Sequence, residues 1–445
     1  MNYIPHTESE TKEMLKVIGA PSVEHLFKHI PPDLRPKSFN LPEGKSEFEV
    51  LEYLKTLSRQ NAVGLSGFLG AGFYDHFIPQ TVDALANRSE FYTAYTPYQP
   101  ECSQGWLQAI YEYQSVICAL TGLDVSNASL YDGGTALFEA AMMAIRLSGK
   151  RKIIVDSGVS LIYRTMLYTY TSNLSIEFVE TPVVHGQSCR EDIYKVLDDK
   201  TAAIIVQNPN FFGAVDDFSD IAQKAHACGA LVIASVYPVS LGLLKTPAEM
   251  GVDIATGEGQ SLGIPLSFGG PYLGFIAVKK EHLRQMPGRI VGATVDSDNR
   301  RGFVLTLQAR EQHIRRERAT SNICSNQSLC ALRALIYSTL LGKQGFAELA
   351  RLNYQKAEFT KALLGKIKGV QVKRSSPTFN EFTVLLPKNA DQVVFKMIKE
   401  GFACGFPLGR FYKGMDNYLL VAVTEKRTKE DISHFVNSLE AALCS

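Results

Sequence analysis

From residue 128 onward, short β-branched runs alternate with amphipathic stretches whose apolar positions recur at helical spacing. The helical stretches include residues 135–148 and 218–228. Alternation of this kind is typical of βαβ units around a mostly parallel sheet. We therefore predict an α/β domain of about seven strands, at Ala128–Tyr131, Lys152–Asp156, Ser175–Val179, Ala202–Gln207, Leu231–Val236, Asp253–Thr256 and Tyr272–Val278.

The two ends of the chain differ from this pattern. Residues 1–60 form an arm of small helical pieces that are separated by Pro21, Pro31, Pro32, Pro36 and Pro42. Such an arm has little core, and it either packs across another subunit or caps its own domain. The large domain then covers residues 61–325.

Residues 326–445 are predicted to form a smaller α+β domain. Two helical segments open it, and three short strands follow with helices between them. The helical segments are Asn326–Leu341 and Phe346–Ile367, and the strands are Val370–Lys373, Glu381–Leu386 and Tyr418–Val423.

Composition excludes several functions. Net charge is +1, so no global field attracts nucleic acid or a membrane surface. No run of about 18 apolar residues and no N-terminal signal core occur, which predicts a cytoplasmic protein. The eight cysteines are scattered without zinc spacing, so we expect them to be reduced, buried and structural, with no metal site.

The first candidate for chemistry is Asp132-Gly133-Gly134-Thr135, at a predicted strand end directly before a helix. Backbone N–H groups at a helix N-terminus can hold a phosphate group. The same residues also suit an ordinary strand-to-helix turn. The sequence leaves both interpretations open.

A second motif sets a register. Residues 208–213, Asn-Pro-Asn-Phe-Phe-Gly, follow a buried strand and match the N-P-x-x-x-G pattern of aminotransferase-type pyridoxal phosphate enzymes. Asn208 is then expected at the carboxyl edge of the sheet, where open α/β sheets bind ligands. In that register the next strand should carry an aspartate for the pyridine nitrogen, but Ala234 stands there.

The lysine position follows 26 residues after Ala234, within residues 257–263, and it is occupied by Gln260. An amide cannot form the Schiff base on which this chemistry depends. Lys245 is the nearest alternative Schiff-base lysine in the sequence, but its surroundings indicate a loop residue with a solvated amine. We therefore predict that this chain has no catalytic residue of its own and does not bind the cofactor covalently.

Two further segments are rich in binding groups. Residues 91–105 form a proline-broken loop with three tyrosines, which suits an interface, an active-site rim or a packed surface loop. Residues 310–322 form a charged helical run, typical of a solvated face with a Glu311–Arg315 pair. With Arg300 and Arg301 upstream, its Arg310, Arg315 and Arg316 also suit a basic patch for an acidic partner.

These blocks resemble the glycine-cleavage P-protein family, glycine decarboxylase, in its form split into two polypeptides, and within it the first (α) subunit. The resemblance covers essentially the whole chain. It is carried by Tyr3–Thr7, Tyr92–Glu101, Asn127–Gly133, Gln312–Glu317 and Ala319–Cys324.

The resemblance implies a type I pyridoxal phosphate fold and an α₂β₂ assembly in which the β subunit carries the cofactor and its lysine. The assembly decarboxylates glycine and transfers the aminomethyl group to the lipoyl arm of H-protein. On this hypothesis Tyr95, Thr96, Gln99 and Glu101 shape the partner's site in trans. The alternatives are a structural or regulatory partner of β, and an independent cofactor enzyme that uses another lysine.

Overall fold

The computed structural model describes residues 5–62, 64–93, 95–267, 269–373 and 376–444. The chain divides into two compact units, Met1–Val63 and Gly64–Ser445. In the first unit, α1 (Glu8–Ile18) and α2 (Glu47–Ser58) are joined by two short 3₁₀ turns. Both helices begin with a capping box, Thr7 with Glu10 and Ser46 with Glu49, and neither contains a buried residue. The prediction of small helical pieces is confirmed. That the arm packs across another subunit or caps its own domain stays a prediction.

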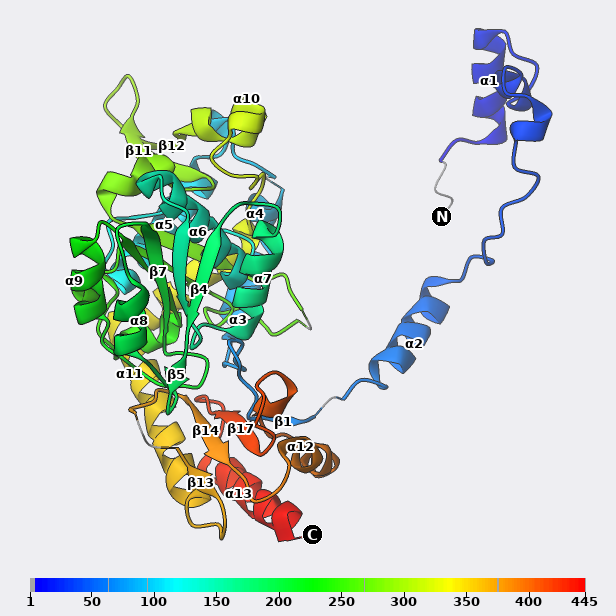
Figure 1. Ribbon diagram of the computed structural model, residues 1–445. Helices are drawn as coiled ribbons and strands as arrows, with labels where there is room; N and C mark the ends of the chain where they lie inside the picture. Colours follow the sequence, from blue (N-terminus) through cyan, green and yellow to red (C-terminus); the bar gives the residue numbers. More distant parts are fainter. Residues whose placement is uncertain (1–4, 63, 94, 268, 374–375, 445) are drawn as a thin grey trace. The chain divides into compact units, whose positions relative to one another are not determined.

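The second unit is built around a sheet of seven strands, the number predicted, and their order is β2-β10-β9-β8-β7-β3-β4 (Figure 1). Five neighbouring strands are parallel, whereas β10 runs antiparallel to β9 and β2. The strands are β2 (Val125–Ser126), β3 (Lys152–Asp156), β4 (Glu177–Thr181), β7 (Thr201–Asn208), β8 (Leu231–Val236), β9 (Ile254–Glu258) and β10 (Gly274–Val278).

The predicted strand at Ala128–Tyr131 is wrong. The edge strand is instead Val125–Ser126, and of the later residues Leu130 makes only an isolated bridge to Gly274. Ala128 donates its N–H to the Arg289 carbonyl, and Ser129 has a positive φ of 151°. This departure from strand geometry directs the chain towards the helix that starts at Gly133.

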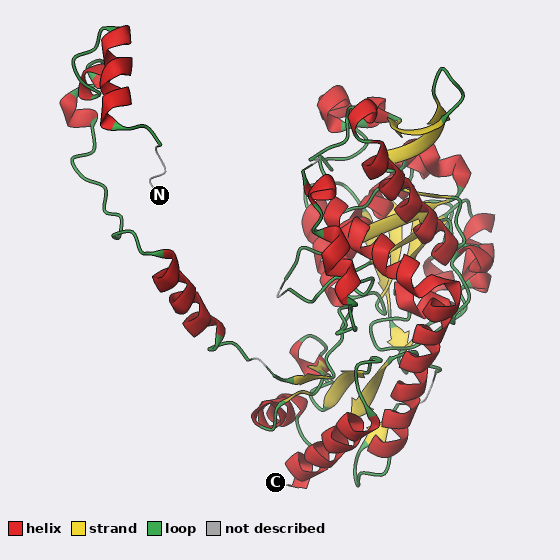
Figure 2. Cartoon of the chain, turned by 180° about the vertical axis from the view of Figure 1, so that it is seen from behind, coloured by secondary structure: helices red, strands yellow, loops and turns green. Residues whose placement is uncertain are grey.

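Helices cover both faces of the sheet (Figure 2). Alternate strand residues divide between two hydrophobic clusters, for example Val232 and Ala234 in one and Ile233 in the other. On the Ile233 face lie α6 (Gly133–Ser148) and α7 (Leu161–Thr171). On the opposite face lie α5 (Gln104–Thr121), α9 (Ser219–Ala227) and the first half of α11 (Ser328–Leu364). The remaining α-helices among the described residues of this part are α3 (Gln80–Ala86), α4 (Ser89–Tyr92), α8 (Arg190–Val196) and α10 (Gln312–Arg315).

Helix α11 joins the large sheet to the C-terminal part and is kinked at Gly342, where φ is 60° and ψ is −177°. The predicted break between two helical segments lies at this point. A four-stranded antiparallel sheet of order β13-β14-β17-β16 follows, with its own hydrophobic cluster. Its elements are β13 (Gln371–Val372), β14 (Glu381–Leu385), α12 (Ala390–Lys399), β16 (Phe406–Pro407), β17 (Tyr418–Ala422) and α13 (Lys429–Cys444). Strand β16 was not predicted.

Three two-stranded pairs complete the fold. Strand β1 (Ser66–Gly67) runs parallel to β15 (Phe402–Ala403), and Phe68 belongs to the C-terminal cluster. Strands β5 (Val183–Val184) and β6 (Gln187–Ser188) form a small ribbon. Strands β11 (Ile290–Val295) and β12 (Arg301–Thr306) form a hairpin that the sequence did not predict. The division into domains at residues 61 and 326 stays a proposal.

All eight cysteines are free. The expectation that they are buried is confirmed for Cys330 and Cys404 and is wrong for the exposed Cys102, Cys324 and Cys444, while Cys118, Cys189 and Cys228 are partly buried. In the described part of the chain, no helix combines the length and apolar character needed to cross a membrane. No group of three or more His, Cys, Asp or Glu side chains suited to a metal ion occurs among the same residues.

Candidate functional site

The carboxyl ends of the parallel strands meet the C-terminal sheet around a small cavity, the position where open α/β sheets bind ligands. Its volume is about 30 Å³, roughly the space of one water molecule. None of the residues that line it is a lysine. They are Gly72, Tyr74, Ser160, Tyr163, Gln207, Pro209, Phe211, Ser235, Val236, Tyr237, Glu258 and Glu381.

Gln260 lies beside this cavity, in the turn after β9, and is 2% exposed. Its side-chain oxygen accepts the Tyr74 N–H at 3.0 Å, and its amide nitrogen donates to the Tyr74 carbonyl at 3.1 Å and to the Ile264 carbonyl at 2.8 Å. These three bonds use one acceptor and both donors of the amide. Gln260 therefore has a structural role, because it holds the segment that contains Tyr74 in place.

Ala234 lies on β8, where its side chain packs into the hydrophobic cluster shared with α5 and α9. Because strand residues alternate between faces, the neighbouring Ser235 points to the other face and lines the cavity. Neither residue carries a carboxylate. The residues of this strand that line the cavity are thus Ser235 and Val236.

Glu258, at the end of β9, directs a buried carboxyl group at the first residue of α6. Its oxygens accept the N–H groups of Gly133 at 2.9 Å, Gln260 at 2.9 Å and Leu273 at 3.0 Å. Burial raises the pKa of Glu258 to about 8, against the opposing effect of these donors. At Gly133–Thr135, where the sequence allowed a phosphate site, the Gly133 N–H therefore donates to a carboxyl group of the chain itself.

A second buried carboxyl group, Glu381 of β14, enters the cavity from the C-terminal sheet. It accepts the Ala71 N–H at 2.7 Å and the Tyr74 hydroxyl at 2.9 Å. Burial raises its pKa to about 7. Gly213, with φ of 90°, lies so close that an added Cβ would meet the Glu381 carbonyl at 2.2 Å. Only glycine fits at this contact between the two sheets.

Asn208 ends β7 at the carboxyl edge of the sheet, as predicted. Its amide does not face the cavity, because it exchanges two hydrogen bonds with the backbone of Asp216, at 2.9 and 3.1 Å. In this chain the N-P-x-x-x-G motif consequently fixes the loop after β7.

Sequence reasoning missed a polar network beside Gln260. His76 contacts Glu425 at 2.8 Å through Nδ1 and the Tyr237 hydroxyl through Nε2, while Tyr237 packs on Tyr74 with ring centroids 4.4 Å apart. Glu425 also accepts the Phe77 N–H at 2.6 Å. Residues 76 and 425 are far apart along the chain, and no local pattern signals their contact.

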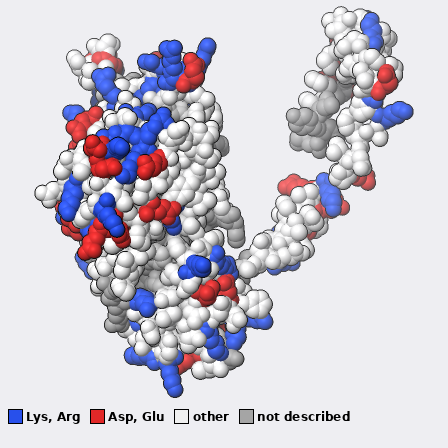
Figure 3. Space-filling view, in the orientation of Figure 1, with Lys and Arg blue, Asp and Glu red and all other residues white. Residues whose placement is uncertain are grey.

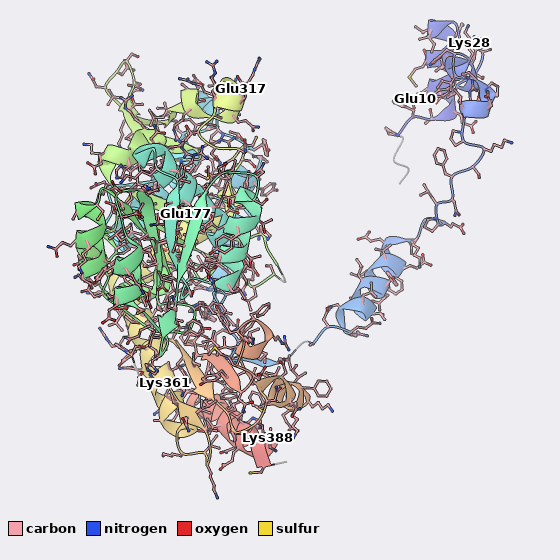
Figure 4. The ribbon with its side chains drawn as sticks, viewed as in Figure 1. Glu10, Lys28, Glu177, Glu317, Lys361 and Lys388 are labelled. Atoms are coloured by element: carbon pink, nitrogen blue, oxygen red, sulfur yellow. The ribbon has the colours of Figure 1, made fainter. Side chains whose placement is uncertain are left out.

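Two lysines bear on the alternative of another Schiff base. Lys245 contacts Asp217 at 3.0 Å and the Ser219 hydroxyl at 2.9 Å on the surface, as expected for a solvated amine. Lys361, labelled in Figure 4, is the one buried lysine of the described residues, and it pairs with Glu358 and donates to Thr378 at 2.9 Å. Neither lysine lines the cavity.

The tyrosine-rich loop lies elsewhere. Tyr95 is 83% exposed, Gln99 and Glu101 are also exposed, and Thr96 is partly buried. Tyr98 packs edge-on against His313 at 5.8 Å and accepts a hydrogen bond from Arg289 at 3.2 Å. The tyrosine-rich loop and the basic segment (residues 310–322) therefore belong to the same surface. That surface lies at the end of the unit that carries the hairpin and α10 (Gln312–Arg315) (Figure 1).

The basic segment is not the continuous helix expected. Helix α10 is one turn long and lies between two 3₁₀ turns, with Arg316 at a φ of 54°. The expected Glu311–Arg315 pair is wrong, because the buried Glu311 carboxylate lies 3.8 Å from Arg289 and 3.7 Å from His313.

The arginines of this segment differ in exposure. Arg310 turns inward and donates to the Gly288 carbonyl at 2.7 Å, and burial lowers its pKa to about 10. Arg315 and Arg316 are exposed. Figure 3 shows basic side chains gathered at this end, where Figure 4 labels Glu317. A surface patch here includes Arg315 and Arg316, whereas Arg310 is partly buried and turned away from it.

A mostly parallel seven-stranded sheet with one reversed strand, followed by a small α+β part, defines the fold of the type I pyridoxal-phosphate-dependent enzymes. The structure is similar to glutamate decarboxylase of Lactobacillus brevis, with a TM-score of 0.67 and 12% identity over 92% of this chain and 95% of that one, which shows the fold alone.

Closer matches place the chain within this class. Residues 1–439 match the family model of the glycine cleavage system P-protein. The chain is 58% identical over 443 residues to the probable glycine dehydrogenase (decarboxylating) subunit 1 of Geotalea uraniireducens, covering 100% of each. A crystal structure of glycine decarboxylase (P-protein) of the glycine cleavage system, in inhibitor-bound form, matches with a TM-score of 0.93 and 44% identity over 100% of both chains. The chain belongs to the glycine cleavage system P-protein family.

Proposed function

We propose that this chain is the α subunit of a two-subunit glycine decarboxylase in the cytoplasm, assembled as α₂β₂. The β subunit carries pyridoxal phosphate on its lysine, and the assembly decarboxylates glycine and passes the aminomethyl group to the lipoyl arm of H-protein. Several relatives named subunit 1, such as that of Geotalea uraniireducens, match this chain over its full length. Nucleic acid and membranes are not partners in this proposal.

The observation that carries the proposal is the size of the cavity. Ligand pockets usually enclose roughly 300 Å³ or more, whereas the cavity at the carboxyl ends of the strands measures about 30 Å³. Tyr74, Tyr163, Glu258 and Glu381 fill the remainder. Gln260 itself lines a separate space of about 310 Å³, with Tyr74, His76 and Lys426. The residues present do not fit pyridoxal phosphate, so the cofactor belongs on the partner.

Two positions account for the lost chemistry in this proposal. Gln260 stands at the Schiff-base lysine position and cannot form an imine. Ala234 stands at the predicted aspartate position, with Ser235 as its cavity-facing neighbour, and neither offers a carboxylate to a pyridinium. Loss of the lysine alone would leave the aspartate that pairs the pyridinium, and loss of the aspartate alone would leave the Schiff base.

The chain contributes to the shared site in trans through Tyr95, Thr96, Gln99 and Glu101. Support comes from the solvent exposure of Tyr95, Gln99 and Glu101. Such groups suit a surface that another protein covers. Arg315 and Arg316 extend this surface as a basic patch for an acidic partner.

Covalent trapping tests where the cofactor lies. Each subunit, alone and co-expressed, is incubated with pyridoxal phosphate and reduced with borohydride, and the labelled peptide is mapped. We expect label on the β subunit and none on this chain. A reduced adduct on a lysine of this chain would support the independent-enzyme alternative and contradict the proposal.

A second measurement separates a catalytic contribution from a purely structural one. Glycine–bicarbonate exchange is measured for co-purified complexes that carry Tyr95→Ala or Gln99→Ala in this chain. Loss of exchange in an intact complex supports a site shared in trans. Unchanged exchange in every such variant favours the structural or regulatory partner.

A further inference from the structure

A larger cavity lies between the C-terminal sheet and the segments that follow β4 and β7. Its volume is about 500 Å³, within the range of roughly 300 to 1,000 Å³ in which proteins bind small molecules. Both β5 and β14 contribute lining residues, and Figure 1 shows these two strands near each other. The cavity shares no lining residue with the small cavity or with the separate space that Gln260 lines.

The alternation of side chains along β14 directs Thr383 into this cavity. Phe382 and Val384 belong to the hydrophobic cluster of the C-terminal part, so Thr383 points to the opposite face of the strand. There its hydroxyl donates to the Phe212 carbonyl at 2.9 Å. The C-terminal sheet and the loop after β7 are thereby joined at one wall of the cavity.

Two aromatic rings and a thioether form the apolar part of the lining. Phe212 is a buried member of a hydrophobic cluster, and Met415 and Tyr418 pack against that cluster. All three residues also line the cavity. Aromatic and methionine side chains favour contact with a flat aromatic ring, so this part of the lining suits a ligand with an aromatic body.

The fixed charge of the lining is positive. Lys373 is the one lysine or arginine among the described residues that line the cavity, and none of those residues is an aspartate or a glutamate. His185 lines the same cavity. Lys373 is exposed, and its Nζ lies 5.6 Å from the centroid of the Tyr418 ring. An anionic group of a ligand would therefore meet a cation beside an aromatic wall.

The backbone of the adjacent loop does not suit a phosphate group, because phosphate sites in loops commonly use several free backbone N–H groups. In this loop the N–H groups of Phe212 and Ala214 both donate to the Asn210 side-chain oxygen at 3.0 Å, and the Gly213 N–H donates to the Asn210 carbonyl at 2.9 Å. Lys373 supplies one fixed positive charge, which matches a ligand with a single negative charge.

We propose that this cavity binds an aromatic monocarboxylate, with the ring against Phe212 and Tyr418 and the carboxylate paired with Lys373. The volume, the apolar walls and the fixed cation each favour this class of ligand. The inference goes beyond the proposed function and does not depend on it, because no residue of the cavity is assigned to the site shared with the β subunit.

Equilibrium dialysis of the full-length chain tests the inference. The probe is naphthylacetate, and naphthylacetamide is its uncharged match. Because Lys373 is exposed, we expect the carboxylate to bind about fivefold more tightly than the amide, which corresponds to roughly 1 kcal/mol. A wild-type chain that binds neither compound at millimolar concentration would overturn the inference.

Two variants locate the binding. Lys373→Gln should lower the affinity for naphthylacetate about fivefold and leave the affinity for naphthylacetamide nearly unchanged, since only the charge pair is lost. Met415→Trp places a larger side chain in the lining of the cavity, so it should weaken the binding of both compounds about tenfold or more.

Lys426→Gln is the matched control, because Lys426 is an exposed lysine that lines the separate space with Gln260. This variant should bind both compounds as the wild type does. The inference is wrong if the preference for the carboxylate persists in Lys373→Gln or disappears in Lys426→Gln. It is also wrong if Met415→Trp, folded by circular dichroism, binds both compounds as tightly as the wild type.

Discussion

The side chain of Gln260 exchanges two hydrogen bonds with the backbone of Tyr74, at 3.0 and 3.1 Å. These bonds join residues 186 positions apart and hold Tyr74 against Glu381 and Tyr237. A residue engaged in this way stabilises the fold and leaves no group free to react. The same position therefore has a structural role that a lysine cannot reproduce.

Gln260→Lys is expected to destabilise the chain by about 3 kcal/mol without restoring cofactor binding. Lysine has no acceptor for the Tyr74 N–H, and burial of its ammonium group carries a desolvation cost. Urea unfolding measures the loss, with Gln108→Lys on the exposed face of α5 as the control. A fully stable Gln260→Lys protein with a borohydride-reducible cofactor would contradict this prediction.

Because the Glu381 carboxyl group is buried, we expect the unfolding free energy to depend on pH. Burial raises its folded pKa from the ordinary 4.5 to about 7, so folding favours the protonated form. Its contribution to the unfolding free energy is complete below the unfolded pKa and is lost as pH rises through about 7.

Glu381→Gln removes this titration. The wild-type unfolding free energy should therefore fall relative to that of the variant between about pH 5 and pH 8, by up to about 3 kcal/mol. Urea unfolding across this range measures the difference. A difference that is constant with pH would show that Glu381 does not titrate as the structure implies.

Gly342 and Gly345 form a matched pair within α11. Gly342 has φ of 60° and ψ of −177°, a conformation that disfavours side chains, so Gly342→Ala should cost about 1 to 3 kcal/mol. An added Cβ on Gly345 would meet Leu341 at an ordinary 3.7 Å, so Gly345→Ala should gain about 0.5 to 1 kcal/mol. Chemical denaturation measures both, and equal effects would argue against the kink.

Tyr95→Ala is expected to lower glycine decarboxylation by the assembled complex about tenfold or more, with little change in the stability of this chain. Tyr95 is 83% exposed, so its ring contributes to an interface more than to the core. Phe395→Ala, on the 63% exposed Phe395 of α12, is the control. Equal activity of the two variants would remove Tyr95 from the shared site.

Arg315→Gln combined with Arg316→Gln should slow association with an acidic partner by up to about tenfold at low salt and leave dissociation nearly unchanged. The effect should weaken as salt is added, because exposed charges are screened. Surface plasmon resonance measures both rates. A variant with Lys366→Gln and Lys368→Gln carries the same charge change elsewhere, and an equal effect of this control would exclude a local patch.

The sequence predicted those parts of the fold in which apolar residues repeat locally. Lys152–Asp156 and Leu231–Val236 form strands with the predicted limits, because both are apolar runs that the sheet buries on both faces. The hairpin at residues 290–306 was missed, since its strands are partly exposed and lie within a charged region. Strand β16 is only two residues long and contains Pro407.

The site was predicted less completely, because its contacts join distant residues. Gln260 was located by its spacing, but its bonds to Tyr74 depend on packing that no local pattern describes. A one-residue difference in register separates Ala234 from the cavity-facing Ser235. Arg310 was expected in an exposed patch, but it is partly buried and donates a hydrogen bond to the Gly288 carbonyl.

The most direct measurement of the central claim is reconstitution of glycine decarboxylation from separately purified subunits. Release of CO₂ from carboxyl-labelled glycine is followed with H-protein and pyridoxal phosphate present, for this chain alone, for the β subunit alone and for the two together. We predict activity only when both subunits are combined. Decarboxylation by this chain alone would contradict the account.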